Sequence, residues 1–99
     1  MVEEVIMYLI LVYDISLKDH IGRRALRKVF KKCKEYLNHI QNSVFEGELT
    51  EGQVMQLKYE LKELIRDDKD SVILFSSREE KWLNKDIMGL NKNAFSNLL

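Results

Sequence analysis

The segment that most constrains this fold is an unbroken apolar run near the start of the chain, Ile6 to Tyr13, which reads IMYLILVY. A run with no polar face suits a β-strand buried on both sides better than an amphipathic helix. A membrane-spanning helix needs about 20 such residues, and Glu3 and Glu4 stand where a secretion signal has basic residues. We therefore expect a cytoplasmic protein without a membrane segment, built around a strand that stops at Asp14.

The next segment has the period of a helix. Between positions 23 and 37 the apolar residues recur at helical spacing and the cations fill the opposite arc, which predicts a two-faced helix over Arg23–Leu37. Residues 17–21 predict a polar loop before this helix, and the loop is expected to end at Gly22. Cys33, the single cysteine, falls in the apolar arc and is expected to be a core residue.

The rest of the chain predicts further strands and a second helix. Residues 39–49 suggest one strand, with Gly47 as a bulge or as its end. Thr50 and Gln53 have the spacing of a capping box at the start of a helix. Residues 71–75 (SVILF) indicate a third strand, and residues 82–88 a weaker fourth. A chain of 99 residues has room for one core, so we expect a single domain over 1–99, a ferredoxin-like βαββαβ sandwich of the α+β class with both helices on one face.

Asp14 is the first candidate for chemistry. A carboxylate at the end of a central strand is held rigidly and reaches solvent, as a metal ligand or an acid–base group must. An aspartate also starts turns, and that plainer role is the commoner one at such a position. The sequence by itself leaves both roles open.

The cations of the first helix are the second candidate. Eight basic residues and one acid lie between positions 18 and 34, in a chain whose 16 basic and 16 acidic residues balance. A basic face on a neutral chain is typical of a polyanion site, whereas a solvated helix face usually mixes both signs. The residues expected to bind nucleic acid are Arg23, Arg24, Arg27, Lys28 and Lys31.

Several blocks of the sequence occur together in the order and spacing of one family. They are Val12-Tyr13-Asp14-Ile15-Ser16, the basic helix, Ile40 to Gly47 (IQNSVFEG), and the apolar strand from Ser71 to Phe75. In these blocks the chain resembles the Cas2 family of small CRISPR-associated spacer-acquisition proteins. The resemblance runs from Met7 to about Met88, which is nearly the whole chain.

The resemblance implies a symmetric homodimer in which the C-terminal segment, here 89–99, adds to the partner's sheet. Phe95, Leu98 and Leu99 are the apolar residues of that segment. It implies a metal-dependent endonuclease of RNA or double-stranded DNA that binds the CRISPR integrase and uses Mg²⁺ or Mn²⁺. Asp14 matches the family's metal-binding and catalytic acid, and the residues that shape the site would be Tyr13, Ser16 and Phe45.

Two other functions stay open beside the nuclease. The dimer could bridge DNA for the integrase without hydrolysis, since one aspartate per chain provides few groups for catalysis. A toxin-type messenger RNA nuclease on the same fold is the third possibility. For catalysis, a twofold axis near the strand ends would have to bring two copies of Asp14 to one ion, because a lone carboxylate holds Mg²⁺ poorly.

Overall fold

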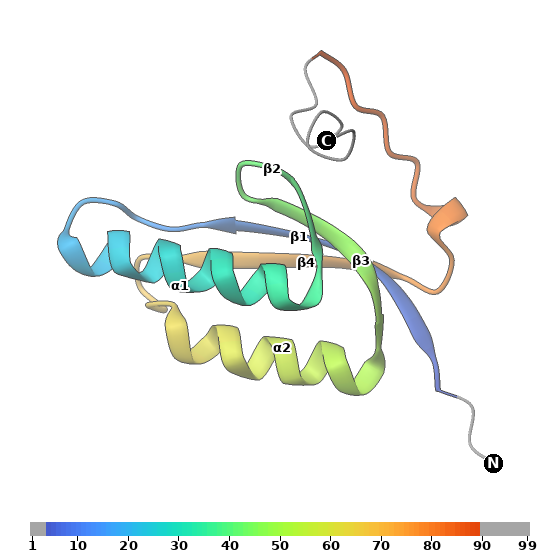
Figure 1. Cartoon of the computed structure of the whole chain (residues 1–99), viewed down its shortest axis with the longest axis horizontal. Coiled ribbons are helices and arrows are strands. Elements are labelled where there is room, and N and C mark those ends of the chain that lie inside the picture. The colour runs from blue at the N-terminus through green and yellow to red at the C-terminus, as the bar shows by residue number, and fades with distance from the viewer. Residues whose placement is uncertain (1–3, 90–99) are drawn as a thin grey trace.

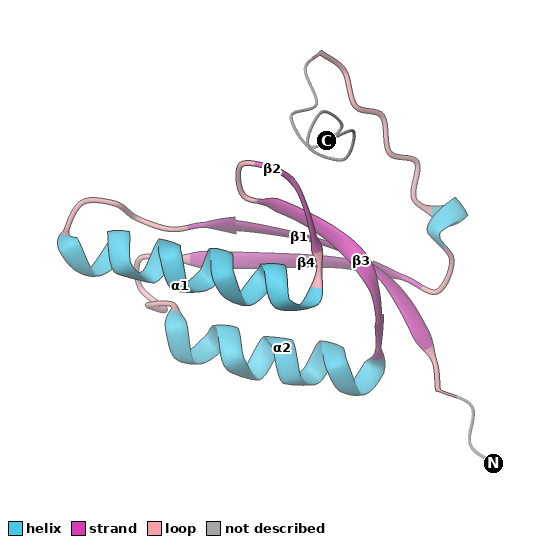
Figure 2. Cartoon of the chain, viewed as in Figure 1, coloured by secondary structure: helices cyan, strands magenta, loops and turns pink. Residues whose placement is uncertain are grey.

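The computed structural model describes residues 4–89 and has the expected βαββαβ order (Figure 1). The strands are β1 (Ile6–Asp14), β2 (Asn38–Gln41), β3 (Val44–Thr50) and β4 (Ser71–Ser77). The helices are α1 (His20–Tyr36) and α2 (Glu51–Leu64), and a 3₁₀ turn, η1 (Glu80–Trp82), follows β4. The strands form one antiparallel sheet in the order β2-β3-β1-β4, and both helices cover the same face of it (Figure 2). This is the ferredoxin-like arrangement.

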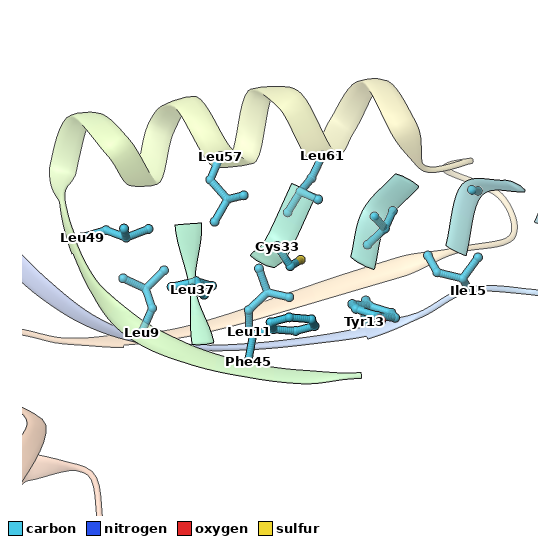
Figure 3. Close-up of a cluster of buried hydrophobic side chains, with 12 residues drawn as sticks. Leu9, Leu11, Tyr13, Ile15, Cys33, Leu37, Phe45, Leu49, Leu57 and Leu61 are labelled. Carbon is cyan, nitrogen blue, oxygen red and sulfur yellow. The ribbon is translucent and has the colours of Figure 1, made fainter. Parts of the chain in front are cut away.

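The apolar run forms the central strand, as predicted. β1 lies between β3 and β4, and its Leu9 and Leu11 side chains are fully buried beneath the helices. Figure 3 shows them between the sheet and α2, which contributes Leu57 and Leu61 to the same core. Cys33 is also fully buried there, which confirms it as a core residue.

The first helix begins earlier than the sequence predicted. α1 starts at His20 rather than Arg23, because Asp19 caps it: the Asp19 carboxylate accepts a hydrogen bond of 2.8 Å from the Gly22 N–H. Gly22 therefore lies inside the first turn and does not close a loop. A Cβ on Gly22 would lie 1.8 Å from the Ser16 carbonyl oxygen, so the residue is glycine because the loop backbone passes against it.

The predicted strand over 39–49 is in fact a hairpin. Asn42 and Ser43 form its turn, and Asn42 adopts a left-handed backbone with φ of 40°, which asparagine tolerates better than most residues. The bulge lies between His39 and Gln41 of β2, not at Gly47. Gly47 pairs with Leu9 inside β3, so its expected role as a bulge or strand end is wrong.

The weaker strand expected over 82–88 is also wrong. Within the described residues this segment holds only the end of η1 and irregular backbone without strand pairing. The predicted capping box is confirmed, since the Thr50 hydroxyl accepts from the Gln53 N–H at 3.1 Å and the Gln53 side chain accepts from the Thr50 N–H at 2.9 Å. Within residues 4–89 no helix has the length and apolar character needed to cross a membrane.

The face of the sheet opposite the helices carries an apolar patch as well. Cross-strand pairing places Val12 between Val44 and Ile73, and Ile10 opposite Phe75. Ile73 and Phe75 are each 52% exposed, which is unusual for side chains of this kind in a sheet. We call these five residues the open sheet face, and β4 borders it as an edge strand.

Candidate nucleic-acid-binding and metal-binding site

Asp14 is the last residue of β1 and pairs with Ser71 of β4. It follows Val12 by two residues, so its side chain leaves the sheet on the side of the open sheet face. The residue is exposed, and no ion pair or hydrogen bond to another residue of the 4–89 region engages its carboxylate. A rigid strand thus presents a free anionic group to solvent, as the sequence predicted.

Tyr13 and Phe45 lie on the other side of the sheet from Asp14. Tyr13 is 5% exposed and Phe45 fully buried, with their ring centroids 5.9 Å apart. Burial is the main cause that raises the pKa of the Tyr13 hydroxyl, so this group stays protonated. The Tyr13 N–H also donates to the Ser43 carbonyl at 3.1 Å, which ties the end of β1 to the hairpin turn. Both rings therefore fix the strand that carries Asp14 from beneath.

Ser16 is held through its backbone by a cluster that the sequence did not predict. The Ser16 N–H donates to Asp70 Oδ1 at 2.9 Å, and the Ser16 carbonyl accepts from Arg66 Nη2 at 2.8 Å. Arg66 also donates to both oxygens of Asp70, at 3.1 Å each, and to Asp19 Oδ1 at 2.9 Å. We call Asp19, Arg66 and Asp70 the loop clamp, because they join the residues after Asp14 to the start of α1 and to the α2–β4 connection.

The charges of the loop clamp stabilise one another. Burial alone would raise the pKa of Asp70, but hydrogen bonds from Arg66 and Ser16 outweigh it and hold that pKa below its usual range. The pKa of Asp19 is also lowered, chiefly by the Gly22 N–H and then by Arg66. The only hint in the sequence is the i,i+4 spacing of Arg66 and Asp70, in a stretch that otherwise indicates a charged turn.

The predicted basic residues of α1 all face solvent. In the part of the chain that the structure describes, none of them has an acidic side chain within 4.0 Å, whereas the neighbouring Lys32 pairs with Glu35 and Glu60. We call this set the basic face: Arg23, Arg24, Arg27, Lys28 and Lys31. Five unpaired cations on one helix form a surface that can bind several phosphates.

A second polar cluster fixes the chain after β4. Lys85 and the Tyr8 hydroxyl both contact the Glu46 carboxylate, which anchors the segment after η1 to the sheet. Burial opposes ionisation of Glu46, but hydrogen bonds from Lys85 and Tyr8 lower its pKa. Burial, and then the neighbouring Glu46, raise the pKa of Tyr8 well above its usual range. The Tyr8 hydroxyl is thus a protonated donor at neutral pH.

Within residues 4–89, one chain does not provide a complete metal site. The described residues contain no group of three or more His, Cys, Asp or Glu side chains placed to hold an ion. Asp14 offers one free carboxylate, and Mg²⁺ keeps several waters and is commonly held by one or two carboxylates. A second copy of Asp14 would bring this donor set to the two carboxylates that Mg²⁺ commonly uses.

Fold and site define a class: a small ferredoxin-like protein with a solvent-facing carboxylate at the end of its central strand, joined by a short clamped loop to a cationic helix. The model of the family described as CRISPR associated protein Cas2 matches residues 7–85. The chain belongs to the Cas2 family.

Curated relatives and solved structures agree with this assignment. The chain is 55% identical over 93 residues to the CRISPR-associated endoribonuclease Cas2 of Fusobacterium nucleatum, covering 94% of this chain and 87% of that protein. It is 42% identical to CRISPR-associated endoribonuclease Cas2 2 of Moorella thermoacetica, covering 92% of this chain and all of that one. A crystal structure of a Cas2 superposes with a TM-score of 0.75 at 34% identity, covering 88% and 91% of the two chains. Streptococcus pyogenes Cas2 superposes with a TM-score of 0.64 at 32% identity, covering 69% and 82%.

Proposed function

We propose that this protein is a homodimeric, metal-dependent endonuclease of the CRISPR system that cleaves RNA, and that it also binds double-stranded DNA and the CRISPR integrase during spacer acquisition. The observation that carries the proposal is the free, exposed carboxylate of Asp14 at the end of the central strand, on the same chain as the unpaired basic face. The names of the relatives in Fusobacterium nucleatum and Moorella thermoacetica, both endoribonucleases, support RNA as the substrate.

The open sheet face supports the homodimer. Its exposed Ile73 and Phe75 would leave water if two sheets packed against each other, which stabilises association. Asp14 emerges on the same side of the sheet, so a twofold axis near the end of β1 would bring the two copies of Asp14 together. The outer edge of β4 has no partner strand among the described residues, and it offers a place for the partner's segment 89–99 to add. Apart from Gly89, that segment lies outside the described residues.

Each part of the site then has a separate task. The basic face binds phosphates of the nucleic acid and orients the backbone toward the end of β1. The loop clamp and the buried Tyr13 hold Asp14 in place, so that little reorganisation is needed when substrate binds. The two Asp14 carboxylates would hold Mg²⁺ or Mn²⁺. When bound, such an ion supplies positive charge beside the phosphodiester and a water that ionises more readily.

A DNA-bridging adaptor without hydrolysis is the second candidate function. The observation that favours it is the single functional carboxylate per chain, with no cluster of further ligands in the described region. The adaptor needs the basic face and the dimer, but it does not need Asp14. The two functions therefore separate on one side chain.

The test is the variant Asp14→Asn, which removes the charge and keeps the shape. We expect it to abolish metal-dependent cleavage of a labelled RNA while circular dichroism and the dimer mass by light scattering stay unchanged, because Asp14 makes no contact that holds the fold. Asp67→Asn, at an exposed acid of the α2–β4 turn, is the matched control. Cleavage by Asp14→Asn at the wild-type rate would refute the nuclease mechanism. If the wild type does not cleave and both proteins bind duplex DNA equally, the adaptor is favoured.

A further inference from the structure

The first residue of β4, Ser71, lies directly across from Asp14 in the sheet. Residues directly opposite each other in an antiparallel pair project to the same face, with their Cβ atoms about 4.5–5.5 Å apart. The Ser71 side chain therefore leaves the sheet beside that of Asp14, on the side of the open sheet face, and both residues are exposed. Together they form a polar row at the end of the sheet, next to the apolar row of Val12 and Ile73.

The Ser71 hydroxyl is free in the part of the chain that the structure describes. No hydrogen bond to another residue of the 4–89 region engages it. The serine at the other end of the strand, Ser77, differs, because its hydroxyl donates to the Glu79 carbonyl at 2.9 Å. A serine hydroxyl can donate one hydrogen bond and also accept. A free donor and acceptor thus stands beside the free carboxylate of Asp14.

The loop clamp fixes the backbone on both sides of this pair. Asp70, the residue before Ser71, has a fully buried side chain that accepts from the Ser16 N–H at 2.9 Å. The Asp70 N–H donates to the Arg66 carbonyl at 2.8 Å. One carboxylate thus joins the residue before Ser71 to the segment after Asp14, and this contact holds the two strand ends together. The hydroxyl and the carboxylate are therefore preorganised for a common ligand.

We propose that Ser71 is a positioning residue of the Asp14 metal site, where its hydroxyl holds a water of the bound Mg²⁺ or Mn²⁺. Mg²⁺ demands near-octahedral geometry and keeps several waters when one or two carboxylates bind it, so groups that hold those waters complete the site. A neutral hydroxyl does this without adding a negative charge that would repel the substrate phosphate. The inference rests on the proposed function, because it takes Asp14 to be the metal ligand.

The proposed dimer gives the hydroxyl a further reason to bind there. If a twofold axis brings two copies of Asp14 together, it also brings two copies of Ser71 to the same site. Packing of the two open sheet faces would take this polar row out of bulk water, and a hydroxyl that leaves water without a hydrogen-bond partner costs free energy. The waters of the ion supply that partner.

Isothermal titration of the protein with Mn²⁺, without nucleic acid, measures metal affinity separately from cleavage. Two variants have the same shape and differ only in the hydroxyl: Ser71→Thr keeps it, and Ser71→Val replaces it by a methyl group. Both new side chains are β-branched and suit a strand. Ser71→Ala removes the hydroxyl without adding bulk. Ser76→Ala, at an exposed serine of the same strand on the opposite face, is the matched control.

We expect Ser71→Val and Ser71→Ala to weaken Mn²⁺ binding by about tenfold to a hundredfold, the usual effect of removing a group that supports a metal site from outside. Ser71→Thr and Ser76→Ala should bind Mn²⁺ like the wild type. Circular dichroism and light scattering should show an unchanged fold and mass in Ser71→Ala, because the Ser71 hydroxyl makes no hydrogen bond within residues 4–89.

The outcomes separate the two proposals. If Ser71→Ala binds Mn²⁺ like the wild type while Asp14→Asn loses the ion, the inference is overturned and the proposed metal site stands. If Ser71→Thr loses as much affinity as Ser71→Val, the loss follows the shape of the side chain and not the hydroxyl, and the inference is again overturned. If the wild type and Asp14→Asn bind Mn²⁺ alike, Asp14 is not a metal ligand, and the proposed function fails together with the inference.

Discussion

Replacing Asp70 by Asn tests whether the loop clamp holds the residues that follow Asp14. The Asp70 side chain is fully buried and accepts four hydrogen bonds. Oδ1 accepts from the Ser16 N–H and from Arg66 Nη2, and Oδ2 accepts from the Arg66 N–H and from Arg66 Nε. Asparagine has the same shape, but it turns one of the two oxygens into a donor.

The expected loss follows from this geometry. Whichever way the introduced amide turns, one backbone N–H and one guanidinium N–H face another donor, so two of the four hydrogen bonds to the side chain at position 70 are lost. A hydrogen bond to a charged group contributes about 1.5–3 kcal/mol. Allowing for water that reaches the guanidinium, we expect the free energy of unfolding to fall by about 3 kcal/mol, a large part of the roughly 5–15 kcal/mol of a small domain.

The effect of Asp70→Asn should depend on pH with a definite sign. The folded protein lowers the pKa of Asp70, so its stabilising contribution is complete above the ordinary aspartate pKa and is lost as the pH falls through the lower folded value. The difference between wild type and variant should therefore be constant near neutral pH and shrink in strong acid.

Urea unfolding at one fixed protein concentration, followed by circular dichroism at several pH values, measures this difference. Glu35→Gln, at an exposed pair with Lys32, is the control and should change the midpoint little. A loss below about 1 kcal/mol, or a difference that does not shrink in acid, would refute the reasoning about the clamp.

The remaining predictions concern the basic face, the tail and one glycine. Binding of duplex DNA by the dimer should show a slope of log affinity against log salt concentration of roughly −5 to −7. The triple variant Arg23→Ala/Arg24→Ala/Arg27→Ala should flatten this slope equally for all DNA sequences. An unchanged slope would mean that the basic face contacts solvent and not phosphates. Deleting residues 91–99 should weaken dimerisation, as light scattering over a dilution series would show, and a truncated chain that stays dimeric at low concentration would count against the strand exchange. Gly22→Ala should lower the free energy of unfolding in urea by about 3 kcal/mol, because its Cβ would meet the Ser16 backbone. The control Gly52→Ala, whose Cβ would have only Thr50 Oγ1 at 4.0 Å, should raise the free energy of unfolding slightly. Equal effects of the two substitutions would contradict the close approach at Gly22.

The parts of the fold that the sequence predicts are those with a strong local pattern. The unbroken apolar run indicated the central strand, and the separation of cations from apolar residues indicated α1. The spacing of Thr50 and Gln53 indicated the start of α2. In each case the residues that decide the structure are close together in the sequence, so the local pattern of residue types predicts the element.

The parts that were missed depend on contacts between distant segments or on single turn residues. The hairpin turn at Asn42 looked like strand, because its neighbours alternate and nothing but one asparagine marks the turn. The early start of α1 depends on Asp19, which Arg66 orients from 47 residues away. The position of Asp14 was predicted from the end of the apolar run, but the clamp that fixes the loop after it was not, since Asp70 is 54 residues from Ser16.

The most direct test of the central claim is the stoichiometry of metal binding, measured by isothermal titration of the dimer with Mn²⁺. If the open sheet faces bring two copies of Asp14 to one site, the wild type should bind one Mn²⁺ per two chains, and Asp14→Asn should bind none at that site while remaining dimeric. One ion bound per chain, or binding that survives in Asp14→Asn, would contradict the shared site and with it the proposed role of Asp14.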